Sequence, residues 1–227
     1  EVITDEETLN SLWLTFIVLL PTILLKLIFA ICASWCISKY EFFGKTILLT
    51  IIDLPFSISP VVIGFTLILV FGKNSIIGKI LDDLGIQIIF NLPGLIIATI
   101  FVTLPFIAKK MIIIMRMQSK SEEEAALILG ASEIKIFLQI TLPKIKWAMI
   151  HGILLCFARA VGEFGAVSIV SGHIRGLTNT APLHIEILYN EYNPIAAFIV
   201  ASILAILSVV ILILKNIIEH KYIKKDA

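Results

Sequence analysis

Long runs of apolar residues alternate with short polar segments along most of the chain. Five runs are long enough to cross the hydrocarbon core of a bilayer, which takes roughly 20 residues in a helix. They lie at Ser11–Ile37, Ile47–Phe71, Asn91–Met115, Trp147–Val170 and Ile195–Leu214. The pattern predicts an all-α, polytopic transmembrane helix bundle with five visible spans.

The composition agrees with a membrane protein. Only 15% of the 227 residues are charged and the mean hydropathy is +1.02, whereas soluble domains are about 25% charged. The net charge of +1 provides no polybasic surface for nucleic acid. The three cysteines lie in apolar runs and the four histidines are scattered, so we expect no metal site and no disulfide framework.

The basic residues set the expected orientation. Most Lys and Arg fall between the first and second runs, between the third and fourth, and after the fifth. By the positive-inside rule these segments and the C-terminus are cytoplasmic, and the N-terminus faces outward across the inner (plasma) membrane. Five spans with an outward N-terminus and no signal peptide form an awkward topology, so we expect a sixth span before Glu1 in the complete protein.

The cytoplasmic segment 121–143 is patterned more regularly than the other loops. Ser121 precedes Glu124 by three residues, the spacing of a helix capping box. Gly130 then permits a turn without a Cβ penalty. Ser132 is placed to cap a second short helix, and Pro143 suits the first turn of the next span.

The predicted product is a helix–turn–helix elbow, residues 121–143, with an apolar face. Leu129 belongs to that face in the first helix, and Ile134, Phe137 and Leu138 share one face of the second. An apolar face must rest on the protein's own bundle, on the membrane surface or on a soluble partner. Periodicity alone leaves all three open.

The elbow resembles a known family. Its residues match the EAA-x3-G-x9-I-x-L-P loop of binding-protein-dependent (MetI-like) ABC permeases at every defining position: Glu124, Ala125, Ala126, Gly130, Ile140, Leu142 and Pro143. The resemblance implies that residues 1–227 form one permease domain and that the elbow carries the coupling helices that dock into a cytoplasmic ATPase. It also implies two ATPase subunits, a homologous permease subunit and a periplasmic or lipid-anchored binding protein.

We expect no nucleotide site in this chain. Phe43–Thr46 contains the tail of a phosphate-binding loop, but position 39, where the first glycine would stand, is Lys39. An intramembrane aspartyl protease using Asp53 would need a second aspartate within the spans, and the other aspartates lie outside them. We therefore expect a transport subunit that is no enzyme and binds no cofactor, with ATP and Mg²⁺ held by the partner ATPase.

Further stretches are similar to permeases for tetrahedral oxyanions. They are Asp53–Pro60, Ala158–Val167, Ser171–Thr180 and Glu186–Tyr192. The last two most resemble the CysW-type second permease subunit of sulfate/thiosulfate importers, which implies a heterodimer. The alternative is a molybdate or tungstate permease, usually a homodimer. The resemblance extends from about Leu12 to Leu214.

The second span contains the first candidates for a translocation path. Pro55 and Pro60 interrupt helical hydrogen bonding, and Ser57 and Ser59 place hydroxyls on one side. Asp53 lies about 10 Å into the span at 1.5 Å per residue. These features predict a broken helix that faces a cavity.

Arg159 and Glu163 lie in the predicted fourth span, four residues apart and so on one face. One interpretation is a structural pair in which each charge neutralises the other. The other places Arg159 on the path of a dianion, with Glu163 keeping its binding weak. Beyond this span, His173 and Arg175 either contact the binding protein or an entering anion, or belong to a solvated loop.

Overall fold

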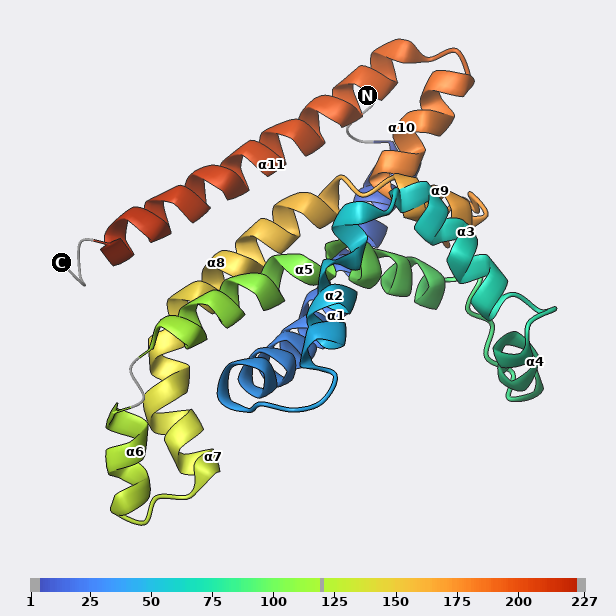
Figure 1. Cartoon of the computed structure of the whole chain (residues 1–227). Helices are drawn as coiled ribbons and strands as arrows, with labels where there is room; N and C mark the ends of the chain where they lie inside the picture. The colour runs from blue at the N-terminus through green and yellow to red at the C-terminus, as the bar shows by residue number, and fades with distance from the viewer. Residues whose placement is uncertain (1–4, 119–120, 224–227) are drawn as a thin grey trace.

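The computed structural model describes residues 5–118 and 121–223, and every regular element in that part of the chain is helical (Figure 1). The elements are α1 (Glu6–Lys39), α2 (Lys45–Ser57), α3 (Pro60–Phe71), α4 (Ile76–Asp83), α5 (Leu92–Met117), α6 (Ser121–Ile128), α7 (Glu133–Ile136), the π-helical segment η2 (Phe137–Thr141), α8 (Leu142–Val161), α9 (Gly165–Ser171), α10 (Ala181–Asn190) and α11 (Pro194–Ile223).

Four continuous helices of the described chain are long and apolar enough to cross a membrane. They are α1, α5, the α7–η2–α8 helix from Glu133 to Val161, and α11. The α2–α3 pair makes a fifth span if its two parts are taken together, although they are bent by 118°. The structure thus confirms the all-α fold, with four apolar spans or five if the bent α2–α3 pair is one span, and it shows the predicted break after α2.

The predicted fourth span, Trp147–Val170, was wrong at both ends. Helix α8 stops at Val161, and Gly162, Glu163 and Phe164 separate it from the short α9. At the other end α8 begins at Leu142, before the predicted start, with Pro143 in its first turn as predicted, and it continues a helix that starts at Glu133. The sequence did not reveal the first break, because α9, which follows Gly162 and Glu163, is as apolar as a continuing helix would be.

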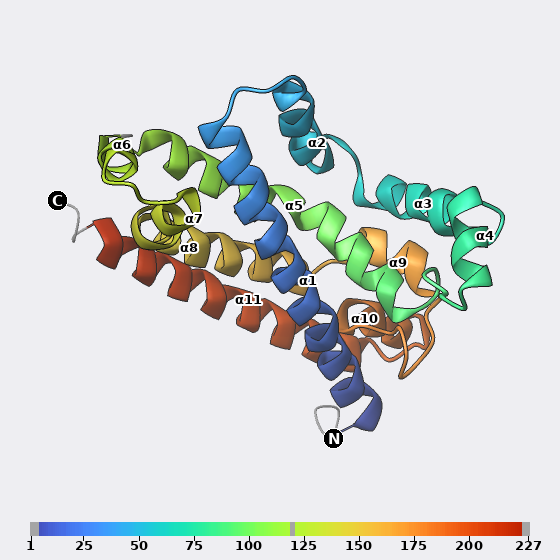
Figure 2. The ribbon, with the colours of Figure 1, turned by 90° about the horizontal axis from the view of Figure 1, so that it is seen from below.

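Helix α5 lies at the centre of the bundle and packs against α1, α2, α3, α8 and α9 (Figure 2). Apolar side chains of α1, α2, α5 and α8 form a core towards the elbow. A second core, built mainly by α3, α5 and α9, fills the other half. Helix α11 packs along α8 and α10 on the outside of this arrangement (Figures 1 and 2).

Glycines let the two half-helices α3 and α9 pack closely side by side. A Cβ on Gly64 would stand 2.7 Å from the Cβ of Ile169, and one on Gly165 would stand 2.9 Å from the Cβ of Pro60. Both separations are shorter than a normal van der Waals contact. The two helices therefore start at the same level and run in the same direction.

A buried lysine joins three of the spans. The Lys26 ammonium of α1 donates to the carbonyl of Thr103, to its Oγ1 at 2.7 Å and to the Sγ of Cys156 at 2.8 Å. Its three protons thus have three acceptors, from α5 and α8. The Lys26 side chain is almost fully enclosed. These hydrogen bonds offset the free-energy cost of burying its charge.

Candidate translocation path and coupling elbow

The break in the second span follows from its prolines. Helix α2 ends at Ser57, and Ile58 and Ser59 take extended conformations with ψ of 136°. Pro60 disfavours the helical conformation at the residue before it and then occupies the first turn of α3. Two short helices therefore replace one straight span.

A cavity of about 340 Å³ opens at this break. Its lining consists of Pro55–Pro60 together with Val102, Phe106 and Arg159. Ser57 and Ser59, which were proposed from the second span, thus share one cavity wall with Arg159, which comes from a span 100 residues further along. We call this the Arg159 cavity.

Arg159 is held in place by a buried carboxylate. Its Nη1 lies 2.7 Å from the Oε2 of Glu163, whose side chain is 2% exposed, against 38% for Arg159. The Oε1 of Glu163 accepts from the backbone N–H of Ala166 at 3.2 Å and so caps α9. Glu163 stands just beyond the end of α8 and does not line the cavity, whereas Arg159 does.

Asp53 lies apart from this cavity. Its carboxylate pairs with the ammonium of Lys109 on α5 at 2.9 Å, and both side chains are nearly half exposed. The same ammonium lies 4.9 Å from the centre of the Phe56 ring. The structure therefore ties Asp53 to the α2–α5 contact and leaves Ser57 and Ser59 as the cavity hydroxyls of that span.

Gly130 forms the turn of the elbow as predicted. Its φ is +81°, and its N–H donates to the carbonyl of Leu127 at 2.9 Å. The next N–H, of Ala131, donates to the carbonyl of Ala126 at 3.0 Å. These two bonds define a Schellman motif, which ends α6 and reverses the chain.

The second half of the elbow is joined to the membrane-spanning part. Ser132 caps α7 by accepting from the N–H of Lys135 at 3.4 Å, as predicted. The N–H of Leu142 then donates to the carbonyl of Phe137, five residues back, in a π turn. Because Pro143 has no N–H to donate, it favours a local change of register here. The predicted cap at Ser121 borders residues 119–120, which lie outside the described residues, and stays a prediction.

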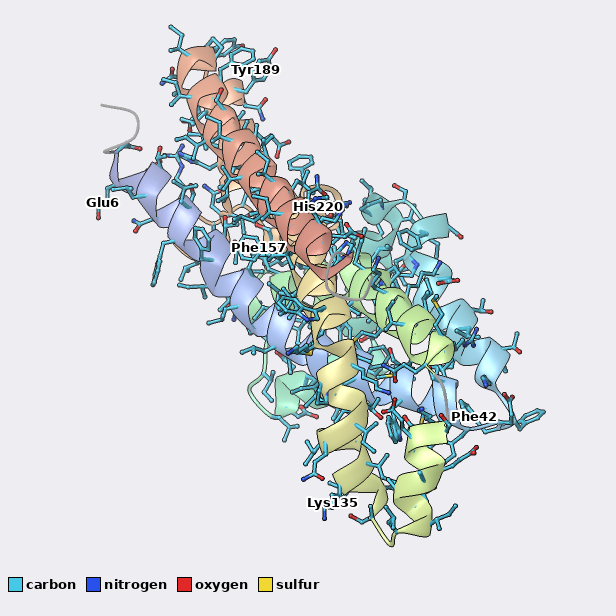
Figure 3. All side chains as sticks on the ribbon, turned by 90° about the vertical axis from the view of Figure 1, so that its left-hand side faces the viewer. Glu6, Phe42, Lys135, Phe157, Tyr189 and His220 are labelled. Carbon is cyan, nitrogen blue, oxygen red and sulfur yellow. The ribbon has the colours of Figure 1, made fainter. Side chains whose placement is uncertain are left out.

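Most of the elbow's apolar face has no cover among the described residues, although Phe137 packs against Trp35 of α1. Leu129 is 87% exposed and Ile134 73% exposed, and Leu127, Ile128 and Leu138 are also exposed. Figure 3 shows the elbow projecting beyond the other helices, with Lys135 near its end. The described bundle therefore covers Phe137 and leaves the rest of this face open.

The defining residues of the EAA pattern spread over the elbow. Glu124, Ala125, Gly130 and Pro143 are exposed, and Ala126, Ile140 and Leu142 are partly buried. The exposed members can meet another protein, while the partly buried ones pack inside the elbow.

Polar and charged contacts hold the segment after α9. His173 Nε2 lies 3.1 Å from the carboxylate of Glu186, and Arg175 bridges Glu7 at 2.7 Å and Glu191. His173 and Arg175 are thus partnered within the chain while remaining accessible. Among residues 5–118 and 121–223, no three His, Cys, Asp or Glu side chains gather as a metal site would require.

Two side chains outside the spans have shifted pKa values. Burial lowers the pKa of His184 on α10, whose ring contacts the hydroxyl of Thr8 at 3.1 Å. The ring is therefore neutral near pH 7. A hydrogen bond to Glu133 raises the pKa of Tyr40, which follows α1.

Comparison with known proteins identifies the family. The model of the family described as "binding-protein-dependent transport system inner membrane component" matches residues 26–224. The chain belongs to this family. The permease is therefore a multi-pass inner membrane protein and a transport subunit.

Sulfate permeases are among the similar proteins. The permease is 42% identical to the sulfate transport system permease protein CysW of Escherichia coli K12, over 96% of the chain and 75% of that protein. It is 46% identical to CysW of Synechocystis, over 96% of the chain and 79% of that protein. Sulfate permease 2 of the Chlamydomonas reinhardtii chloroplast is 42% identical over 95% of the chain and 58% of its own length.

A solved structure has the same fold. The bacterial alginate ABC transporter, in complex with its alginate-bound periplasmic protein, matches with a TM-score of 0.79 over 97% of the permease and 81% of the matched chain. Sequence identity is 15%, so this likeness concerns the fold alone.

Proposed function

We propose that this permease forms the translocation path for sulfate in an ABC importer driven by ATP hydrolysis on partner subunits. The observation that carries the proposal is the identity of 42–46%, over nearly the whole chain, to sulfate permeases of two distant bacteria. A molybdate or tungstate permease is not favoured, because these relatives are named as sulfate permeases.

The Arg159 cavity is the proposed passage. Its guanidinium and the hydroxyls of Ser57 and Ser59 offer donors to the oxygens of a dianion. The start of α3 on the same wall adds partial positive charge. Glu163 neutralises part of the Arg159 charge, so an anion is attracted without being trapped. Asp53 would act on the elbow side of the cavity, through its pairing with Lys109.

The elbow is the proposed docking surface for one of two ATPase subunits, which bind the ATP and Mg²⁺. Its uncovered apolar face and the exposed Glu124, Ala125 and Gly130 support this role. The elbow and the C-terminus would then be cytoplasmic.

A periplasmic or lipid-anchored binding protein would approach the opposite end, where His173 and Arg175 are accessible. A homologous permease would complete a heterodimer.

Uptake of labelled sulfate tests the proposal directly. Cells without their own sulfate permeases would receive the full-length protein with its partner permease, ATPase and binding protein. We expect ATP-dependent sulfate uptake that excess unlabelled thiosulfate inhibits and molybdate does not. Robust molybdate uptake without sulfate uptake would overturn the choice of solute and leave the ABC mechanism standing.

A charge reversal tests the docking surface. Glu124→Lys should lower the amount of ATPase that co-purifies with the permease at least about tenfold, which corresponds to about 1.4 kcal/mol. The reason is that Glu124 is exposed on α6, so the new charge would face the docked subunit. Asp83→Lys, a charge reversal at another exposed residue, on α4, is the matched control and should leave co-purification unchanged. Wild-type co-purification with Glu124→Lys would contradict the docking role.

A further inference from the structure

Glu123 precedes the EAA residues but turns away from the exposed face of the elbow. Its Oε1 lies 2.6 Å from the ammonium of Lys39 and accepts from the hydroxyl of Thr141 at 2.8 Å. Lys39 is the last residue of α1, and Thr141 closes the π turn. One carboxylate thus joins the first elbow helix both to the end of α1 and to the start of α8.

Two further contacts join the same end of α1 to the second half of the elbow. The hydroxyl of Tyr40 donates to the carboxylate of Glu133 at 3.0 Å. The Trp35 ring packs edge-on against Phe137, with centroids 5.0 Å apart. The last turn of α1 therefore contacts α6, α7 and η2.

The Lys39–Glu123 pair differs from ordinary surface ion pairs. Its side chains are 11% and 12% exposed, and both belong to a network that includes Thr141 and the Trp35 ring, 5.6 Å from the ammonium. Exposed pairs contribute only about 0–1 kcal/mol, because water screens them and long side chains lose entropy. The Lys39–Glu123 pair is shielded from water and has additional partners, so its geometry is much better defined than that of an exposed pair.

Helix α1 continues from this contact to the opposite end of the molecule. It packs along α5 and α8 and then against α10. Near its start the hydroxyl of Thr15 accepts from the N–H of Ala181 at 2.9 Å, and Thr8 contacts His184. Helix α1 therefore physically connects the elbow contact with the segment that holds His173 and Arg175, where Glu7 of α1 pairs with Arg175.

We propose that Lys39 and Glu123 are positioning residues that transmit movement of the elbow to α1, so that ATPase closure acts on the far end of the permease. This inference rests on the proposed docking of the ATPase at the elbow. The pair is assigned to transmission because its side chains are only 11% and 12% exposed and bind one another. Glu124 and Leu127, which border the same pocket, are exposed and so remain available for docking.

The test measures ATPase binding and the ATP hydrolysed per sulfate imported. It uses vesicles that contain the permease, its partner permease, the ATPase and the binding protein. The variants are Lys39→Glu, Glu123→Lys and the double exchange. Each single variant should bind the ATPase as the wild type does, while the ATP hydrolysed per sulfate imported rises at least tenfold. The double exchange restores an ion pair and should return this ratio to within about threefold of the wild type.

Lys45→Glu is the matched control, because Lys45 pairs with Glu41 at 2.6 Å in the loop before α2. It should not change the ratio. An unchanged ratio in both single variants would overturn the inference. Loss of ATPase binding in them would also overturn it, because the pair would then belong to the docking surface. A double exchange no better than the single variants would also overturn it. The wild-type vesicles test the proposed function separately, because they must import sulfate whatever the variants do.

Discussion

Replacing Arg159 by alanine should reduce sulfate uptake by about tenfold to a hundredfold while the transporter still assembles. The guanidinium is the cation that lines the cavity at the break between α2 and α3. A charge-assisted hydrogen bond contributes about 1.5–3 kcal/mol, and every 1.4 kcal/mol changes a rate or an equilibrium tenfold. Labelled-sulfate uptake, normalised to the amount of assembled complex, measures the effect.

Three further variants test whether Arg159→Ala loses sulfate uptake because the anion passes the Arg159 side chain. Arg159→Lys keeps the charge but loses the planar donor pair, and should retain intermediate uptake. Glu163→Gln removes the partner carboxylate, so sulfate should bind more tightly and leave more slowly. Lys79→Ala removes an exposed cation on α4, away from the cavity, and should transport normally. Normal uptake by Arg159→Ala would mean that the Arg159–Glu163 pair has only a structural role.

Replacing Gly64 by alanine should destabilise the permease by about 1–3 kcal/mol, the usual cost of overpacking a closely packed site. The added Cβ would stand 2.7 Å from the Cβ of Ile169 and 3.0 Å from the carbonyl oxygen of Ala166. Shortening Ile169 to alanine would not relieve the clash, because its Cβ is the nearest atom. Helices α3 and α9 would have to separate, which would widen the Arg159 cavity and lower uptake.

Thermal unfolding of the purified complex in detergent measures the stability change. Gly162→Ala is the matched control, because Gly162 has a φ of −96° and a Cβ there would meet no atom within 4 Å. We expect a clear fall in the unfolding temperature for Gly64→Ala and little change for Gly162→Ala. Equal unfolding temperatures would mean that α3 and α9 are not packed as closely as described.

Local signals in the sequence determined much of the fold. The apolar runs placed α1, α5 and α11, because a membrane span requires continuous hydrophobicity. Pro60 predicted the broken second span, since it removes a backbone donor and restricts the residue before it. Gly130 and Ser132 fixed the turn and the second cap of the elbow, because both act within a few residues.

Only the tertiary structure decided which distant residues meet. Neither the pairing of Lys39 with Glu123 nor the meeting of Arg159 with Ser57 and Ser59 has a local signature, because each joins residues 84 or more positions apart. The end of α8 at Val161 was also hidden, since α9, which begins three residues after the break starts, is as apolar as a continuing helix would be. Hydrophobicity specifies that a segment is buried in the membrane, whereas packing against α3, through Gly64 and Gly165, specifies how α9 lies there.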